Sequence, residues 1–535
     1  MGIKDKIVLI TGAANSIGYS TAQDLLRNGA AHIAILDLPN SGGEKSAANL
    51  NSEFGENKVI FLPVDVMKSK EFEDGFKKTY ETFKGLDIVI NNAGISDDSN
   101  WEKMNDININ GVIRGILLGY DYLSKEKGHN GGTIVNIASI VGLDPIVTAP
   151  CYSASKCAVI GLSRSFGDSY YYEKTGVRIL TMCPGVTTTP LISEAAKKLL
   201  SWVPSEDALK ELKTLPVQKV DNVSQGMVHI LKNAKNGTIW VSEGGEPVYE
   251  VRIPERHTLK VSRDDTKDQN MQIKDKKAII TGGVNTLGLA FARELLRNGA
   301  AMVILIDDQE SIGRVAAETL NSEFGKNRVL YLSCDVTNSS QFDKIFKEAT
   351  TALGGLDILI NNAETINEVT FNKAIDVNVT AVFRATLLGI QQMGKDLGGK
   401  GGVIVNVASI LGLDGFPLLP AYATAKHAVL SFSRSFAHTY HYQRSGVRVV
   451  VLCPGLTAGS SIENLNAENI EDSEGFVKAI ENFSPQRVES VAHGLVYMIR
   501  CAQNGSVWVS ENSKPVYEIQ LPNTLPRKCV QVEDI

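Results

Sequence analysis

The stretch KIVLITGAANSIG (Lys6–Gly18) joins a short, apolar, β-branched run to a turn that contains glycine. A helical segment is expected to follow, from Ile17 to about Asn28. Such a turn lets backbone N–H groups approach a pyrophosphate at the N-terminus of the helix, as in dinucleotide-binding domains. Glycine turns after strands are also common without a ligand, so this stretch alone leaves a purely structural role open.

Similar short apolar runs recur along the first half of the chain. They are His32–Asp37, Lys58–Asp65, Leu86–Asn92, Gly132–Ser139 and Val177–Pro184. Strands that are nearly continuous in apolar residues and alternate with helices predict a parallel sheet covered on both faces. Right-handed crossovers then give a doubly wound α/β domain whose ligands bind beyond the carboxyl ends of the strands.

The sequence contains an internal repeat. DLLRNGAA (from Asp24), GLDIVINNAG (from Gly85) and NGTIWVSEGGEPVYEV (from Asn236) return as ELLRNGAA (from Glu294), GLDILINNAE (from Gly355) and NGSVWVSENSKPVYEI (from Asn504). A period this long indicates a duplicated domain. We therefore predict two doubly wound, parallel-sheet α/β domains of the Rossmann type in tandem, over residues 1–251 and 273–522. Residues 252–272 are expected to form a polar linker and residues 523–535 a C-terminal tail.

Composition limits the classes of protein to consider. The 535 residues are 43% hydrophobic and 21% charged with a net charge of −6, which favours a soluble globular protein and argues against a nucleic-acid partner. Seven cysteines without a CxxC pair indicate thiols in a reducing compartment. No apolar run approaches the roughly 18 residues of a membrane span, and the start lacks a secretory signal pattern. We expect a cytoplasmic protein without a membrane partner.

Two carboxylates add to the nucleotide signal. Asp37 ends the second apolar run, about 20 residues beyond the start of the helix, where a carboxylate can accept hydrogen bonds from an adenosine ribose. Asp307 has the equivalent place in the second half. The same charge would repel a 2′-phosphate, so the cofactor NAD is favoured over NADP.

A Tyr-x-x-x-Lys pair occurs in both halves, as Tyr152/Lys156 and Tyr422/Lys426. On a helix, this spacing puts both side chains on one face. A tyrosine with a pKa near 10 is a poor base, but a nearby ammonium group and a positive nicotinamide ring both stabilise its phenolate. An isolated pair is usually a solvated helix face. The nucleotide turn and the upstream Ser139 at a strand end favour a catalytic role.

One set of motifs can now be assembled: the Thr11–Gly18 turn, NNAG (Asn91–Gly94), Asn108, Ser139, the Tyr-x-x-x-Lys pair and PG (Pro184–Gly185). Together they resemble the short-chain dehydrogenase/reductase family, and the resemblance covers nearly all of both halves. The resemblance implies an NAD-dependent oxidoreductase that transfers a hydride between a secondary alcohol or ketone and NAD. It implies that Tyr152 is the general acid/base and that Ser139 holds the substrate oxygen. Lys156 would bind the nicotinamide ribose and lower the tyrosine pKa, and Asn108 would position a water molecule.

The resemblance also implies a set of residues around NAD. In the first half these are Gly12, Ser16, Ile17, Gly18, Asp37, Asp65, Val66, Asn92, Ala93, Gly94, Tyr152, Lys156, Pro184, Gly185 and Thr189. The second half repeats the catalytic set as Asn378, Ser409, Tyr422 and Lys426, and the cofactor set as Gly282, Gly288, Asp307, Asp335 and Asn362. No metal site is expected.

The halves depart from the family pattern in three places. Ser16 and Thr286 replace a glycine of the turn, and a hydroxyl there can itself hydrogen-bond phosphate. Glu364 replaces the glycine of NNAG, and Gly459 replaces Thr189. Two unit charges ~4 Å apart at an effective dielectric of ~20 repel by about 4 kcal/mol, so Glu364 is expected to disfavour an anionic cofactor. A left-handed backbone at this position would cost about 1–2 kcal/mol more. The alternative is that Glu364 points into solvent.

These departures predict that the first half dominates turnover, while the second binds NAD more weakly or accepts another substrate. Two other functions stay open: a catalytically silent storage or scaffold protein, and a carrier of a lipid-like ligand. A fused tandem supplies both copies at high effective concentration, so an intramolecular pseudo-dimer is expected, which could assemble further into a homo-oligomer. The sequence does not identify the substrate or the preferred direction.

Overall fold

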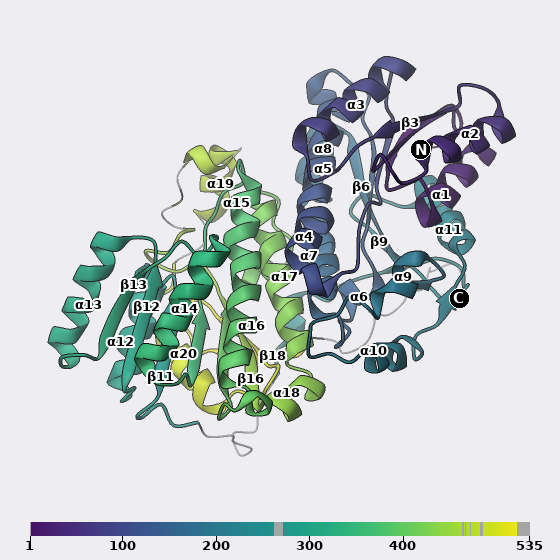
Figure 1. The fold of residues 1–535 in the computed structure, drawn as a ribbon. Coiled ribbons are helices and arrows are strands. Elements are labelled where there is room, and N and C mark those ends of the chain that lie inside the picture. The colour runs from purple at the N-terminus through teal and green to yellow at the C-terminus, as the bar shows by residue number, and fades with distance from the viewer. Residues whose placement is uncertain are drawn as a thin grey trace. The chain divides into compact units, whose positions relative to one another are not determined.

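The computed structural model describes residues 2–261, 271–462, 465, 467–470, 472–481 and 485–521. They form two compact units (Figure 1). Unit 1 consists mainly of the chain up to Ile253, and unit 2 of Pro254–Asp414 and Ala421–Leu521. Within the described residues, no helix combines the length and the apolar character that crossing a bilayer requires.

Unit 1 contains one large sheet with helices around it. Its strands are β1 (Ile7–Thr11), β2 (His32–Asp37), β3 (Val59–Pro63), β4 (Ile88–Asn91), β5 (Gly132–Ile137), β6 (Val177–Pro184), β9 (Ile239–Ser242) and β10 (Tyr249–Val251), with a separate small pair β7 (Val186–Thr187) and β8 (Val217–Gln218). Its α-helices are α1 (Ser16–Arg27), α2 (Gly43–Phe54), α3 (Ser69–Phe83), α4 (Trp101–Asn105), α5 (Gly111–Leu123), α6 (Ile140–Leu143), α7 (Pro150–Phe166), α8 (Ser169–Thr175), α9 (Pro190–Ala195), α10 (Ser205–Leu212) and α11 (Val220–Asn233).

The strand order is β3-β2-β1-β4-β5-β6-β9-β10. The strands from β3 to β9 run parallel, which confirms the predicted doubly wound sheet, and β10 pairs antiparallel with β9. The sequence analysis did not predict β9 and β10. Only residues 243–248 connect them, which is too short for a crossover, so the chain returns as a hairpin.

Helices cover both faces of this sheet, as predicted (Figure 1). Helices α1, α2 and α11 lie on one face, and α3, α5 and α7 lie on the other. Every residue of β4 and β5 is buried, which explains why these strands are almost continuously apolar. The predicted first helix is confirmed to within one residue at each end.

Unit 2 repeats this architecture. Its strands are β11 (Lys277–Thr281), β12 (Met302–Asp307), β13 (Val329–Ser333), β14 (Ile358–Asn361), β15 (Gly402–Val407), β16 (Val447–Pro454), β17 (Val507–Ser510) and β18 (Tyr517–Ile519), in the order β13-β12-β11-β14-β15-β16-β17-β18. Its α-helices are α12 (Thr286–Arg297), α13 (Glu310–Phe324), α14 (Ser339–Leu353), α15 (Phe371–Ile375), α16 (Ala381–Met393), α17 (Pro420–Phe436), α18 (Thr439–Ser445), α19 (Ser473–Ile480) and α20 (Val488–Cys501).

The first part of the predicted linker lies against unit 2. Arg256 pairs with Asp414 at 2.9 Å and with Glu511 at 2.8 Å. The backbone N–H of Gln520 donates to the carbonyl of Leu259 at 2.8 Å, next to the edge strand β18. These contacts group residues 254–261 with unit 2. Of the other predicted linker residues, 252–253 belong to unit 1 and 271–272 to unit 2. Residues 262–270 and the predicted tail 523–535 lie outside the described residues.

Candidate active site

The turn between β1 and α1 depends on close backbone contacts. Gly12 has φ +63°, and a Cβ there would lie 2.8 Å from the Cα of Ala93. A Cβ on Gly18 would lie 2.7 Å from the carbonyl oxygen of Gly12. The Asn92 side chain donates to the carbonyls of Thr11 and Gly12 at 2.9 and 2.8 Å, which ties the chain after β4 to the turn. Only glycine fits these two positions.

Asp37 lies beside this turn. Its Oδ2 accepts a hydrogen bond from the backbone N–H of Ala14 at 3.0 Å, and its Oδ1 accepts one from Leu38 at 2.8 Å. Both bonds hold the carboxylate at the carboxyl end of β2. The side chain is therefore held beside the glycine turn, at the edge of the cavity that both line.

The predicted chemical residues of unit 1 come together next to the turn. Ser139 follows β5 at the N-cap of α6, and Tyr152 and Lys156 share one face of α7. The Lys156 ammonium donates to the carbonyl of Ile137 at 3.1 Å and lies 5.8 Å from the centre of the Tyr152 ring.

The environment shifts the pKa of both groups. Burial raises the pKa of Tyr152 to about 12, although a hydrogen bond with Ser139 acts in the opposite direction. Burial lowers the pKa of Lys156 to about 8. The sequence analysis expected the lysine, together with a bound nicotinamide, to lower the tyrosine pKa. In this structure desolvation of the phenolate dominates it, because the ammonium group is turned toward Ile137.

Asn108 lies in a π-helical turn, Asp106–Asn110, between α4 and α5. Its buried side chain accepts from the backbone N–H of Ile95 at 2.9 Å and donates to the carbonyl of Ile95 at 2.9 Å and to Ser155 at 3.0 Å. Such turns occur frequently at functional sites. Here Asn108 joins the segment after NNAG to the helix that carries Tyr152.

Sequence reasoning missed Asp98. Its buried carboxylate accepts from the backbone N–H groups of Cys151 and Tyr152 at 2.8 and 3.0 Å, at the N-terminus of α7. Burial raises its pKa to about 7. Glu368 makes the same two bonds to the first turn of α17 in unit 2, at 2.7 and 3.0 Å. The sequence did contain a signal for this contact, because both halves have an acidic residue at the equivalent position, Asp98 and Glu368.

A single cavity of about 530 Å³ connects these features in unit 1. All of the predicted first-half cofactor residues line it: Gly12, Ser16, Ile17, Gly18, Asp37, Asp65, Val66, Asn92, Ala93, Gly94, Tyr152, Lys156, Pro184, Gly185 and Thr189. Ser139 also lines it, whereas Asn108 supports the wall from behind. Around α9 and α10 the lining is mostly apolar, with Leu191, Ile192, Leu199, Leu212 and Leu215, and also includes Lys198.

Unit 2 retains much of this framework. Gly282 has φ +60° and accepts from the Asn362 side chain at 2.9 Å. Asp307 accepts from the backbone N–H of Val284 at 3.2 Å, as Asp37 does in unit 1. Asn378 lies in the matching π-helical turn, Asp376–Thr380. Three other predicted residues keep the bonds of their unit 1 counterparts: Asp335 accepts from the backbone N–H of Thr337, Ser409 accepts from that of Leu411, and Lys426 donates to the carbonyl of Val407. Gly288, also predicted, donates its backbone N–H to Asn285.

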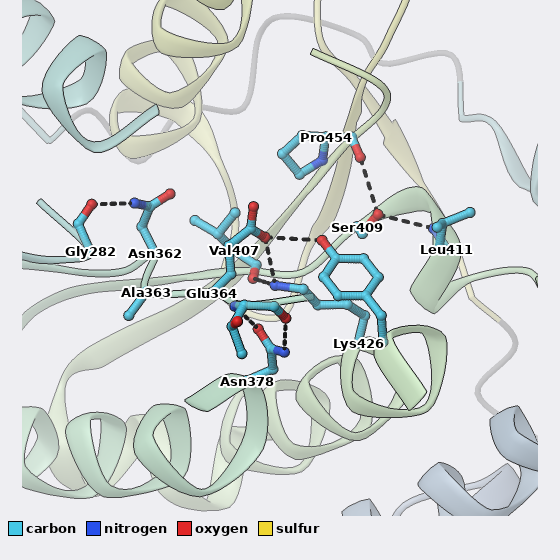
Figure 2. Close-up of polar contacts among 12 residues, drawn as sticks. Gly282, Asn362, Ala363, Glu364, Asn378, Val407, Ser409, Leu411, Lys426 and Pro454 are labelled. Carbon is cyan, nitrogen blue, oxygen red and sulfur yellow. Dashed lines mark hydrogen bonds and ion pairs between the residues drawn. The ribbon is translucent and has the colours of Figure 1, made fainter. Parts of the chain in front are cut away.

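The two units differ at Glu364, which has the place of Gly94. Only 10% of its side chain is exposed, and Figure 2 shows its carboxylate turned toward Lys426. Oε2 accepts from the Tyr422 hydroxyl at 3.0 Å and lies 3.3 Å from the Lys426 ammonium. The alternative in which Glu364 points into solvent is therefore wrong. The left-handed strain is also absent, because neither Gly94 nor Glu364 has a positive φ.

The nucleotide turn of unit 2 also differs. Asn285 accepts from the backbone N–H of Gly288 at 2.8 Å and so caps α12. The Thr286 hydroxyl donates to the carbonyl of Gly459 at 2.6 Å. In unit 1 the corresponding Asn15 makes no capping bond with its side chain. In unit 2 the Thr286 hydroxyl and the Gly288 N–H, which could otherwise meet a phosphate, thus already donate hydrogen bonds within the unit.

Comparison with known proteins agrees with this geometry. A family model described as short chain dehydrogenase matches residues 6–199 and 276–470. The 15-hydroxyprostaglandin dehydrogenase (NAD⁺) of Mus musculus is 36% identical over 243 residues, which are 45% of this chain and 90% of that protein. Alcohol dehydrogenase 2 of Ceratitis capitata is 34% identical over 246 residues, which are 46% of this chain and 94% of that protein.

A solved structure shares the fold. The C-domain of a bacterial malonyl-CoA reductase, crystallised with NADP, superposes with a TM-score of 0.66 at 15% identity, over 93% of this chain and 96% of that one. The two family matches lie one in each unit and together span most of the chain. The chain therefore belongs to the short chain dehydrogenase family, with one complete copy of the fold in each half.

Proposed function

We propose that this protein is an NAD-dependent oxidoreductase that transfers a hydride between a secondary alcohol or ketone and NAD, mainly in unit 1. The observation that carries the proposal is that Tyr152, Ser139 and Lys156 line the same cavity as the glycine turn and Asp37. The relatives named as a prostaglandin dehydrogenase and an alcohol dehydrogenase support the same reaction class.

The residues of unit 1 fit a dinucleotide. Glycines 12 and 18 leave no room for a Cβ but expose backbone to the cavity. A Cβ on Gly94 would lie 3.3 Å from the Lys156 ammonium, so glycine keeps the space beside this lysine open. The Asp37 carboxylate would accept hydrogen bonds from the adenosine ribose and disfavour a 2′-phosphate, which supports NAD.

The reaction follows from the groups around Tyr152. When bound, NAD supplies the acceptor or donor of the hydride. Ser139 and the Tyr152 hydroxyl would hold the substrate oxygen through hydrogen bonds. In ketone reduction Tyr152 donates its proton to that oxygen, and in alcohol oxidation the Tyr152 phenolate takes the proton. The positive charge of Lys156 stabilises the phenolate form that the second direction requires and so opposes the effect of burial.

The wall beyond the tyrosine supports an apolar substrate body. The lining side chains at this end come from α9, α10 and the neighbouring segments, and leucine and isoleucine predominate among them. Burial of such a body contributes about 25 cal/mol per Å² of apolar surface. We infer that secondary alcohols with an apolar substituent bind better than short polar ones.

Turnover with a panel of secondary alcohols, followed through NADH absorbance, tests the proposal. We expect apolar members of the panel to be oxidised by the full-length protein with NAD, and much less efficiently with NADP. NADH binding without any turnover would favour the silent scaffold. Binding of a lipid-like ligand that is unchanged in Tyr152→Phe, again without turnover, would favour the carrier.

Two further parts of the proposal concern the surroundings of the protein. The six cysteines among the described residues are thiols, which supports a cytoplasmic location.

We also propose that the two halves associate as an intramolecular pseudo-dimer. Halves produced separately are expected to associate in sedimentation experiments, and two sedimenting monomers would contradict this.

A further inference from the structure

The position that unit 1 leaves open beside its lysine is filled in unit 2. Gly94 has no side chain, and a Cβ there would lie 3.3 Å from the Lys156 ammonium and 3.2 Å from Asn108 Oδ1. Glu364 has this position in unit 2 and is 90% buried. The two halves thus differ at this point by one carboxylate that reaches into the site.

This carboxylate engages the two groups on which the reaction depends. Glu364 Oε2 accepts from the Tyr422 hydroxyl at 3.0 Å and lies 3.3 Å from the Lys426 ammonium, which also donates to the carbonyl of Val407 at 3.2 Å (Figure 2). In unit 1 the corresponding phenol and ammonium group line an open cavity. One oxygen of Glu364 therefore takes the hydrogen bond that a substrate oxygen would accept.

A neutral substrate competes poorly with this arrangement. The Lys426 side chain is only 2% exposed, so its charge needs a nearby partner, and removing one member of a buried ion pair is strongly unfavourable. A carboxylate is also a stronger hydrogen-bond acceptor than the oxygen of an alcohol or ketone. The substrate oxygen would have to displace Glu364 from both partners at once.

The same contact acts on the tyrosine proton. Burial raises the pKa of Tyr422 well above its usual value, and the negative charge of Glu364 and the hydrogen bond to it raise the pKa further. A hydrogen bond with Ser409 acts in the opposite direction but does not reverse the shift. Tyr422 therefore keeps its proton and directs it toward Glu364.

We propose that Glu364 fills the substrate-oxygen position of unit 2 and closes this unit to alcohols and ketones, so that one side chain silences an otherwise complete Tyr–Lys site. This inference rests on the proposed function, because it assigns to Tyr422 the role of Tyr152. It replaces the expected repulsion of the cofactor with a block at the chemical end of the site.

The test restores the glycine of unit 1 in the full-length protein. In a Tyr152→Phe background, with saturating NAD and an alcohol that the unchanged protein oxidises, adding Glu364→Gly is expected to raise activity at least about tenfold, within the range that acid–base catalysis supplies. Adding Tyr422→Phe to this double variant should remove the gain. The matched control is Glu364→Gln, which keeps the size and an acceptor oxygen and should give no gain.

A second measurement does not depend on turnover. With ¹³C-labelled tyrosine, the Tyr422 Cζ signal, assigned by Tyr422→Phe, is expected to titrate at lower pH in Glu364→Gly than in the unchanged protein. No gain of activity in the Tyr152→Phe/Glu364→Gly variant, or an unchanged Tyr422 titration, would overturn the inference. Full activity of Tyr152→Phe alone would instead contradict the dominance of unit 1, and the titration would then decide the role of Glu364.

Discussion

Two opposing effects act on the pKa of Tyr152. Burial favours its neutral form, whereas the Ser139 hydrogen bond favours the phenolate. Burial also brings the pKa of Lys156 down to about 8, so this ammonium group is still mostly charged at pH 7. The free protein therefore holds a protonated phenol next to a cation, a state that suits proton donation to a ketone.

The pH dependence of the two directions follows from this state. Because the pKa of Tyr152 is raised to about 12, alcohol oxidation, which needs the phenolate, is expected to become faster as pH rises from 6 toward 8, the range in which Lys156 keeps its charge. Ketone reduction, which needs the phenol, is expected to stay constant or fall. The measurement is kcat/KM in both directions across this range. An oxidation rate that falls with rising pH would contradict the role of Tyr152.

Asp98 is expected to make stability depend on pH. Burial raises its pKa from 3.8 to about 7, so the folded protein retains this proton at pH values where the unfolded chain has lost it. Its contribution favours folding below about pH 4 and is lost as pH rises through about 7. Over that range the free energy of unfolding should fall by about 2–4 kcal/mol, at 1.36 kcal/mol per pKa unit.

The Asp98→Asn variant should flatten this dependence in urea unfolding measured at pH 5 and pH 8. Asp121→Asn is the control, because half of that side chain is exposed and it pairs with the exposed Lys127. Equal slopes for Asp98→Asn and the unchanged protein would show that the buried carboxyl does not control the effect.

At this scale the sequence predicted that Tyr152, Lys156 and Ser139 lie together, and they line one cavity, because helical spacing and strand ends determine where such side chains lie. It did not predict where Glu364 points. A glutamate side chain has several rotamers, and its choice depends on Lys426, which lies 62 residues away and becomes a neighbour only through the packing of α17. The rotamer of a buried charged side chain is set by its ion-pair partner, because leaving a buried charge unpaired is strongly unfavourable.

At the scale of elements, the site is assembled at the carboxyl ends of β1, β2, β4 and β5. These strands pair in parallel, so the turn before α1, Asp37, the NNAG segment and Ser139 meet at one edge of the sheet. The apolar runs were sufficient to predict this edge. They did not predict β9 and β10, since these strands are short and the glycine-containing connection between them is typical of a loop.

The close contact between Gly12, which follows β1, and Ala93, which follows β4, can be tested by substitution. Gly12→Ala should destabilise unit 1 by about 2–4 kcal/mol, from a left-handed backbone and a clash with the Ala93 backbone. Gly42→Ala is the matched control, because Gly42 has φ +84° but no atom within 4 Å of its Cβ position. The measurements are urea unfolding and NADH fluorescence titration. Equal stability losses would contradict the close contact.

At the scale of the whole molecule, the duplication has kept the fold and changed the sites. Both units retain the sheet order, the glycine turn and the π-helical turn. The internal repeat was enough to predict two complete domains. The boundary of unit 2 was harder to predict, because residues 254–261 are polar and lack periodicity, although Arg256 and Leu259 attach them to that unit.

This attachment predicts a stability effect far from either site. Arg256→Ala should lower the free energy of unfolding of unit 2 by about 1–2 kcal/mol, because it removes two ion pairs that are only partly exposed. Arg252→Ala is the control, since 83% of that side chain is exposed. Urea unfolding of the full-length protein measures both. A loss no larger than that of Arg252→Ala would show that the segment does not stabilise unit 2.

The central claim is that proton transfer in this protein depends on the phenol of unit 1. The most direct measurement compares Tyr152→Phe with Tyr422→Phe at saturating NAD and alcohol, with NADH binding checked on the same samples. We expect Tyr152→Phe to lose about 10²–10⁴-fold in kcat while NADH still binds, and Tyr422→Phe to retain most of the activity. Loss of activity in Tyr422→Phe with Tyr152→Phe unaffected would contradict the account.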